Sequence, residues 1–193
     1  MPFLISPVLT AGALAGRPQP TLPADGGLVL RPWRDGDAPA VYEVFQDPLM
    51  HQWHARSADS VAEVADWIRT WRQAWEAEQE AHWAVADAET GALLGRVALR
   101  ELRLEDGTAE VAYWTVPEAR GRGVAARATT ALTHWAFEEA GFHRLELLHA
   151  VRNEASCRVA DRTGFGLEGT KRSAIMQPDG WHDMHLHARL RGD

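Results

Sequence analysis

The chain has 193 residues, of which 46% are hydrophobic and 24% are charged, and its formal net charge is −7. These values are typical of one globular domain and leave little room for two. The acidic balance disfavours nucleic-acid binding, and no apolar run is long enough to span a membrane. The single cysteine, Cys157, cannot form an internal disulfide, which fits a reducing cytoplasm.

The chain begins with a segment that we expect to lie outside the domain. Residues 1–25 are rich in Pro, Ala and Gly, which predicts an extended arm, and the domain is expected to span residues 26–193. The first residues lack a basic region and contain prolines, so we interpret them as part of the mature protein and not as a signal peptide.

A strand and two helices are predicted next. Residues 28–33 alternate as a strand does, and Asp37 can cap a helix that Asp47-Pro48 ends. The pattern Ser60-x-x-Glu63 opens a second helix to about residue 78. This helix carries one stripe of tryptophans, which indicates core packing or an aromatic wall of a substrate cleft: Trp67, Trp71 and Trp75.

The rest of the chain predicts a meander of strands followed by alternating helices and strands. The meander strands cover residues 82–88, 93–102 and 109–116. After a glycine-rich loop, helices are expected at 124–140 and from Asn153 to 163, and strands at 144–151, 165–170 and 181–190.

The loop and helix start at residues 116–128 are the main candidate for chemistry. Gly121 and Gly123 allow backbone angles that other residues resist, and the helix that follows exposes unpaired N–H groups. Arg120 and Arg122 add positive charge, so the segment predicts an anion site, with a plain tight turn as the alternative. Neither a P-loop motif nor a Rossmann Gly-x-Gly-x-x-Gly motif is present.

Several segments resemble one family in the order in which that family has them. Arg120-Gly-Arg-Gly-Val-Ala125 looks like the Gln/Arg-x-x-Gly-x-Gly/Ala motif of the GCN5-related N-acetyltransferase (GNAT) superfamily. The strand before this loop and the strand at 144–149 are similar too, as is the start Leu30-Arg-Pro-Trp33. Asn153-Glu-Ala-Ser156 followed by Gly164-Phe-Gly-Leu-Glu-Gly169 resembles the RimJ/RimL branch, which acetylates protein N-termini. The resemblance covers about residues 28–190.

The resemblance implies a single α+β domain of the three-layer α/β type. Its sheet would be mixed and mostly antiparallel, with flanking helices and one splayed pair of parallel strands that admits the pantetheine arm of acetyl-CoA. The co-substrate would transfer its acetyl group to a primary amine by direct attack. The residues implied to bind it are Val116, Arg120, Gly121, Arg122, Gly123, Val124, Ala125, Asn153 and Ser156.

Acetyl transfer needs a base for the amine and a proton donor for the thiolate. Glu110, on the strand that leads to the loop, is our candidate base, although a salt bridge to Arg96 or Arg100 is an equally good interpretation. Many family members use a tyrosine as acid where this chain has Ala160. The RimJ/RimL branch has a serine at the position of Ser156, so the resemblance implies Ser156 as the acid or the hydrogen-bond donor to sulfur, unless it only caps its helix. Weaker alternatives for catalysis are Tyr113, Glu168 and an acylated Cys157 whose pKa Arg158 would lower.

The acceptor is the least specified part of the reaction. The residues expected near it are Trp53, Trp71, Tyr113 and Trp181. A protein N-terminus is the first hypothesis; a small amine (an amino sugar, a polyamine or an amino-acid-like antibiotic) and a non-catalytic CoA-binding domain are the alternatives. We expect no nucleic-acid or membrane partner, and the resemblance allows a homodimer.

A group of histidines near the C-terminus raises the question of a metal. On a strand, His185 and His187 of His182-x-x-His185-x-His187 share one face and His182 points elsewhere. Because no Cys, Asp or Glu follows at a convincing ligand spacing, we expect no metal cofactor.

Overall fold

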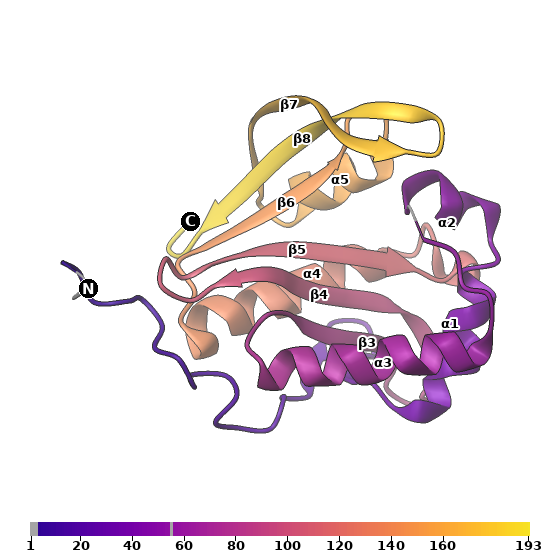
Figure 1. Ribbon diagram of the computed structural model, residues 1–193, viewed down its shortest axis with the longest axis horizontal. Coiled ribbons are helices and arrows are strands. Elements are labelled where there is room, and N and C mark those ends of the chain that lie inside the picture. The colour runs from indigo at the N-terminus through magenta and orange to yellow at the C-terminus, as the bar shows by residue number, and fades with distance from the viewer. Residues whose placement is uncertain (1–3, 55) are drawn as a thin grey trace.

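The computed structural model describes residues 4–54 and 56–193. Within these residues, no helix is both long enough and apolar enough to cross a membrane. The strands form one eight-stranded sheet in the order β1-β2-β3-β4-β5-β6-β8-β7 (Figure 1). Their bounds are β1 Leu22–Ala24, β2 Leu28–Pro32, β3 Ala81–Asp87, β4 Leu93–Arg103, β5 Thr108–Thr115, β6 Arg144–Ala150, β7 Gly166–Gln177 and β8 Gly180–Leu190.

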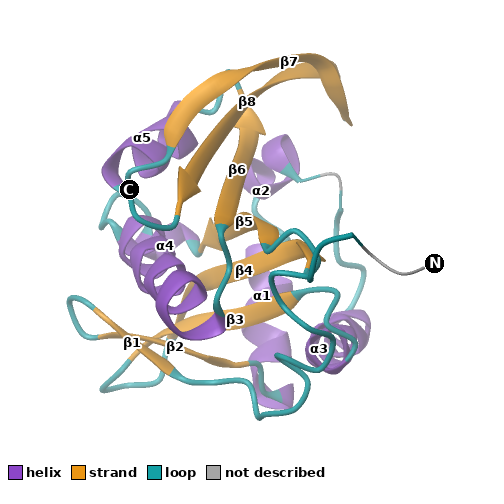
Figure 2. Ribbon diagram, turned by 90° about the vertical axis from the view of Figure 1, so that its left-hand side faces the viewer, coloured by secondary structure: helices purple, strands orange, loops and turns teal. Residues whose placement is uncertain are grey.

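Helices cover both faces of this sheet, which confirms the predicted three-layer fold. α4 and α5 lie on one side and α3 on the other (Figure 2). The bounds of the helices are α1 Ala38–Val44, α2 Pro48–Trp53, α3 Val61–Glu76, α4 Val124–Trp135 and α5 Glu154–Arg162. The turn Ala136–Ala140 extends α4 with π geometry and ends at Gly141, whose φ of 90° is left-handed, as expected for a helix stop.

The parallel pair of strands is the feature that positions the site. All neighbouring strands are antiparallel except β5 and β6, which pair in parallel from Thr108↔Arg144 to Val111↔Leu147. Pairing stops there, although both strands continue, to Thr115 and Ala150. The sheet therefore opens between the C-terminal ends of β5 and β6, as the predicted splayed pair requires (Figure 1).

Three local differences from the sequence-based expectations have clear physical causes. Asp47-Pro48 does not simply end the first helix, because the Asp47 carboxylate accepts a hydrogen bond from the Leu49 N–H and begins α2 with Pro48 in its first turn. Asp37 precedes α1, but its carboxylate forms a buried pair with Arg31 and makes no side-chain cap. β7 is also longer than predicted, since an irregular register with β8 lets it continue past residue 170.

The N-terminal arm packs closely on the rest of the chain. Leu9 and Leu14 are buried, and β1 adds an edge strand to β2. The Glu78 carboxylate accepts hydrogen bonds from the N–H groups of Gly12, Leu14 and Ala15. These contacts hold the arm against the C-terminal end of α3, while the proposed boundary between arm and domain at residue 25 stays a prediction.

The tryptophan stripe on α3 serves mainly as core. Trp75 is buried against Trp83 of β3, and Trp71 stacks on His82 with its ring centroid 5.4 Å away. Trp67 packs edge-on against Phe45 of α1's C-terminal end. Aromatic pairs of this kind stabilise beyond their buried area. Core packing is therefore the interpretation that the structure supports for this stripe.

Candidate active site

The glycine loop adopts the backbone geometry that its sequence predicts. Gly121 and Gly123 have φ of 72° and 73°, in the left-handed region that other residues resist. A Cβ at either position would meet no atom within 4 Å, so the space above the loop is open. Gly123 directly precedes α4, whose first turn exposes unpaired N–H groups and the positive end of the helix dipole.

A cavity of about 370 Å³ lies over this helix start. α2, the end of β5, the glycine loop, α4 and α5 all contribute to its walls. Of the residues expected to bind the cofactor, those that line it are Arg120, Gly121, Gly123, Val124, Ala125, Asn153 and Ser156. Val116 and Arg122 are not among its lining residues: Val116 donates its N–H to the Leu94 carbonyl, and Arg122 is exposed.

Arg120 connects the loop to a helix that the sequence did not predict. Its guanidinium forms an ion pair with Asp47 at 2.5 Å, and Asp47 caps α2. Leu49 and Met50 of α2 line the same cavity. The positive charge of Arg120 is thus partly neutralised, and the arginine also holds α2 at the mouth of the site.

A second chamber, of about 280 Å³, adjoins the first at the opening between β5 and β6. Five residues line both spaces: Trp53, His54, Tyr113, Asn153 and Ser156. Glu101, Glu110 and His149 belong to the second chamber only. The two spaces therefore meet at a junction where a group bound in one can reach a group bound in the other.

Two hydroxyl groups lie at this junction. The buried Tyr113 hydroxyl has no hydrogen bond of good geometry to the described residues. Burial raises the pKa of Tyr113 to about 12, an effect that the neighbouring Ser156 hydroxyl partly opposes. A neutral hydroxyl with an open donor is suited to bind or protonate an anionic sulfur or oxygen.

Asn153 positions Ser156 through the start of α5. The Asn153 Oδ1 accepts a hydrogen bond from the Ser156 N–H at 3.1 Å and so acts as the N-cap. The capping role is thus taken by Asn153, and the Ser156 side chain remains at the junction, where it is 9% exposed. The amide of Asn153 still lines the first cavity, as the resemblance implies.

Glu110 has features of both roles that the sequence left open, a catalytic base and the partner of an arginine. It lines the second chamber and pairs loosely with Arg100, its cross-strand neighbour, at 3.7 Å. Burial raises the pKa of Glu110, while the Arg100 charge opposes that rise. Such a carboxylate is a better proton acceptor than an exposed glutamate at neutral pH. Arg96 is not its partner, because Arg96 donates to His82 instead.

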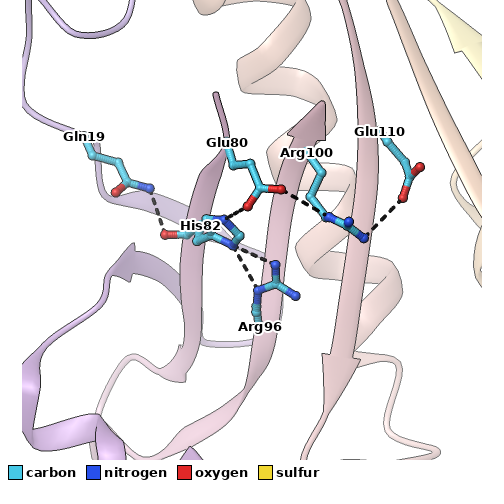
Figure 3. A network of polar contacts seen from close by, with 6 residues as sticks. All are labelled: Gln19, Glu80, His82, Arg96, Arg100 and Glu110. Atoms are coloured by element: carbon cyan, nitrogen blue, oxygen red, sulfur yellow. Dashed lines mark hydrogen bonds and ion pairs between the residues drawn. The ribbon is translucent and has the colours of Figure 1, made fainter. Parts of the chain in front are cut away.

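The pair belongs to a longer polar network across β3, β4 and β5 (Figure 3). Arg100 also donates to Glu80, and Glu80 accepts from His82 Nε2 at 2.7 Å. Because Arg96 can only donate, to His82 Nδ1, the imidazole is neutral and carries its proton on Nε2. The hydrogen bond with His82 lowers the pKa of Glu80 to about 2. Glu80 therefore stays charged and holds Arg100 in place beside Glu110.

Sequence reasoning missed His54, which follows α2 and lines both spaces. Burial, followed by the charges of Arg96 and Arg100, lowers the pKa of His54 to about 4, so its imidazole is neutral at pH 7. The one available signal was Asp47-Pro48, a good cap and first residue for a helix, which would have predicted α2.

The other residues expected near the acceptor differ in where they lie. Trp53 and Tyr113 line the chambers, whereas Trp71 is partly buried and packs against the core, and Trp181 is 62% exposed on β8. Glu168 forms an exposed pair with Arg144, which lowers its pKa and makes it a poor base.

Two further residues of α5 bear on the proton donor and the nucleophile. Ala160 is fully buried and offers no acid. Burial and nearby carboxylates raise the pKa of Cys157, and they outweigh the expected lowering by Arg158.

Comparisons with known proteins agree with this geometry. A sequence model of the acetyltransferase (GNAT) domain matches residues 27–166. The uncharacterized N-acetyltransferase YoaA of Bacillus subtilis is 25% identical over 165 residues, which cover 85% of this chain and 93% of that protein. The ribosomal-protein-serine acetyltransferase of Escherichia coli is 32% identical over 98 residues, 51% of this chain and 55% of that protein.

Solved structures show the same fold. RimL, a ribosomal L7/L12 alpha-N-protein acetyltransferase in complex with coenzyme A, superposes with a TM-score of 0.82 at 21% identity, covering 89% of this chain and 98% of RimL. The ribosomal-protein-S5-alanine acetyltransferase of Vibrio fischeri gives 0.81 at 19% identity, with 90% and 98% covered. With the matched domain, the splayed strands and the glycine loop together, the chain belongs to the GNAT family of N-acetyltransferases and resembles its RimJ/RimL branch.

Proposed function

We propose that this N-acetyltransferase takes acetyl-CoA as its co-substrate and acetylates a peptide-like primary amine, such as the N-terminus of a protein. The observation that supports this most is the junction of two chambers at Tyr113 and Ser156. One chamber has the features of an anion site, and the other carries a half-buried carboxylate, Glu110.

The first cavity has the features that the pyrophosphate of acetyl-CoA requires. Gly121 and Gly123 leave open space where a side chain would stand, and the first turn of α4 supplies N–H donors. Gly123, Val124 and Ala125 would hold the phosphates, and Asn153 would contact the arm that leads to the thioester. We assign Val116 and Arg122 a smaller part, because neither lines the cavity.

In direct transfer of the acetyl group, the carboxylate of the second chamber and the hydroxyls at the junction have different roles. The amine nitrogen attacks the thioester carbonyl carbon, the C–N bond forms, and the C–S bond breaks. Glu110, directly or through one water, accepts the proton that the amine loses. The thiolate that leaves takes a proton from the Ser156 or the Tyr113 hydroxyl, both of which lie at the junction.

The acceptor chamber suits a cationic, extended substrate. Glu101 and Glu110 give it acidic character, and Trp53 offers an aromatic surface for a side chain. Its volume of about 280 Å³ is small, so it would hold the terminal residues of a peptide and leave the rest outside. Relatives named for ribosomal-protein acetylation support this acceptor class.

A thiol-release assay tests the proposal. Purified protein with acetyl-CoA is given peptides with free Ser or Ala N-termini, the same peptides blocked at the N-terminus, and a set of amino sugars and polyamines. We expect release with the free peptides only, and product mass should rise by one acetyl group. Release with the small amines alone would assign the alternative substrate class.

Cofactor binding is tested separately from turnover. We expect acetyl-CoA to raise the melting temperature, because a ligand that binds only the folded state stabilises it. A melting temperature that does not change at saturating acetyl-CoA would overturn the cofactor assignment. Binding without release from any amine would instead favour a non-catalytic CoA-binding domain.

A further inference from the structure

Four potential metal ligands converge beside the junction. His149 lies on β6, His185 and His187 on β8, and Cys157 on α5, and their ligand atoms all lie within 4.8 Å of one another. The register of the antiparallel strands β6 and β8 explains why the three histidines lie close together. His149 pairs directly with His185, and the next pair on the same face of the sheet is Leu147 with His187. Side chains two residues apart share a sheet face, and α5 brings the Cys157 thiol to that face.

The hydrogen bonds of two of these histidines determine which nitrogen carries the proton. His149 Nδ1 lies 2.8 Å from the Ala150 carbonyl oxygen, and His187 Nδ1 lies 3.2 Å from that of Phe165. A carbonyl only accepts, so both Nδ1 atoms carry hydrogen, and in the neutral rings both Nε2 atoms are bare acceptors. Metal-binding histidines are typically held by this kind of hydrogen bond.

These two bare nitrogens face each other. His149 Nε2 and His187 Nε2 are 3.2 Å apart, and both residues are buried, at 5% and 3% exposure. Two lone pairs at this distance repel unless a positive charge lies between or beside them. The arrangement therefore points to a cation. A shared proton would satisfy the two nitrogens, and the Cys157 thiol lies within hydrogen-bond distance of His185 Nδ1, but only a metal ion would engage all four groups at once.

Two of the separations between these groups are close to those of a tetrahedral zinc site. Zinc ligands at about 2.0–2.1 Å for nitrogen and about 2.3 Å for sulfur place two nitrogens about 3.4 Å apart and nitrogen and sulfur about 3.6 Å apart. The observed values are 3.2 Å between the Nε2 atoms and 3.5 Å between Cys157 Sγ and His185 Nδ1. The remaining pairs need to close by no more than about 1.5 Å.

We propose that His149, Cys157, His185 and His187 bind one zinc-like divalent cation in a closed tetrahedral site. Four protein ligands leave no open position, so the ion is structural and not catalytic. It ties α5 to β6 and β8 and so holds Ser156, next to Cys157, at the junction. Binding requires the thiol to lose its proton, which the metal charge favours. This proposal does not depend on the proposed acetyl transfer.

Spacing along the chain does not reveal this group of ligands. His182, the third histidine of that motif, lies apart as expected and contacts Asp179 at 2.6 Å. The other two ligands come from β6 and α5, 28 or more residues away from the His185–His187 pair, where no spacing rule could find them.

Metal analysis of untagged protein tests the site. The protein is stripped with a chelator, reloaded with ZnCl₂, passed through a desalting column and measured by mass spectrometry of the metal. We expect about one zinc per chain for the wild type and for His182→Asn, the matched control on the other face of β8. Cys157→Ser and His185→Asn should lower zinc affinity by on the order of 100-fold.

Cobalt supplies a spectroscopic readout that does not depend on activity. Reloading with Co²⁺ should give the intense visible bands of tetrahedral cobalt and a thiolate charge-transfer band that Cys157→Ser removes. Zinc should also raise the melting temperature of the wild type and not that of Cys157→Ser. Failure of the folded wild type to retain zinc, equal zinc in Cys157→Ser, or an octahedral cobalt spectrum would each overturn the proposal.

Discussion

The two chambers that meet at Tyr113 and Ser156 are built in different ways. The part of the cofactor chamber with the features of an anion site is formed by backbone: two left-handed glycines and the first turn of α4. The acceptor chamber is formed by residues from α2, β4, β5, β6, α5, β7 and β8. Backbone geometry follows from a short stretch of sequence, whereas a side-chain pocket depends on how distant segments pack. The first chamber should therefore respond to changes in one loop and the second to changes in several elements.

The largest effect is expected where the backbone itself binds. Gly123→Asp places a side chain and a negative charge in open space that phosphate would occupy, so acetyl-CoA affinity should fall by more than about 100-fold. Isothermal titration calorimetry measures this. Gly123→Asn, which has the same size without the charge, should lose less.

Backbone strain needs its own control in that experiment. Gly27 has a φ of 72°, almost equal to that of Gly123, and open space around it, but it lines neither chamber. Gly27→Asp should keep the wild-type affinity for acetyl-CoA. Equal affinities in folded Gly123→Asp and wild type would disprove the loop assignment.

The next effect should be confined to the acceptor chamber. Glu110→Gln removes the proposed base, so kcat should fall by on the order of 100-fold while the Kd for acetyl-CoA stays unchanged. Since the pKa of Glu110 is raised, wild-type kcat should increase as pH rises through that pKa, and the variant should lack this limb. Glu168→Gln, an exposed carboxylate outside both chambers, is the matched control. Equal kcat in Glu110→Gln and wild type would exclude Glu110 as the base.

A smaller effect is expected at the junction, where two hydroxyls share one role. Ser156→Ala and Tyr113→Phe should each lower kcat by up to about 10-fold, the value of one hydrogen bond. The double variant should lose more than either single one if only one hydroxyl is needed at a time. Single-turnover rates measure this, and a double variant without any loss would move the proton donor elsewhere, for example to water.

The smallest effect concerns stability. Burial raises the folded-state pKa of Glu110, so the folded state holds its proton at a pH where the unfolded chain has released it. Unfolding free energy therefore falls as pH rises from the ordinary glutamate pKa through the raised one. Glu110→Gln should melt higher than wild type at pH 7 and equally at pH 3, as calorimetry can measure. A variant that melts lower at pH 7 would show that the Arg100 pair outweighs burial.

Local patterns in the sequence predicted much of the fold and the cofactor side. The meander of β3, β4 and β5, the loop with Gly121 and Gly123, and the Asn153 start of α5 each depend on residues close along the chain. α2 was missed because Asp47-Pro48 can either end a helix or begin one, and in the folded chain the Asp47 side chain caps α2.

The sequence by itself therefore determined the left-handed turn of the glycine loop, most of the strands and helices, and the family resemblance, because turn chemistry and capping act over a few residues. Only the tertiary structure decided that Glu110 lines a chamber and also pairs with Arg100. It also placed Trp71 against the core and brought His149 and Cys157 close to His185 and His187. These relations arise from strand register and helix packing, which bring together residues with no fixed spacing along the chain.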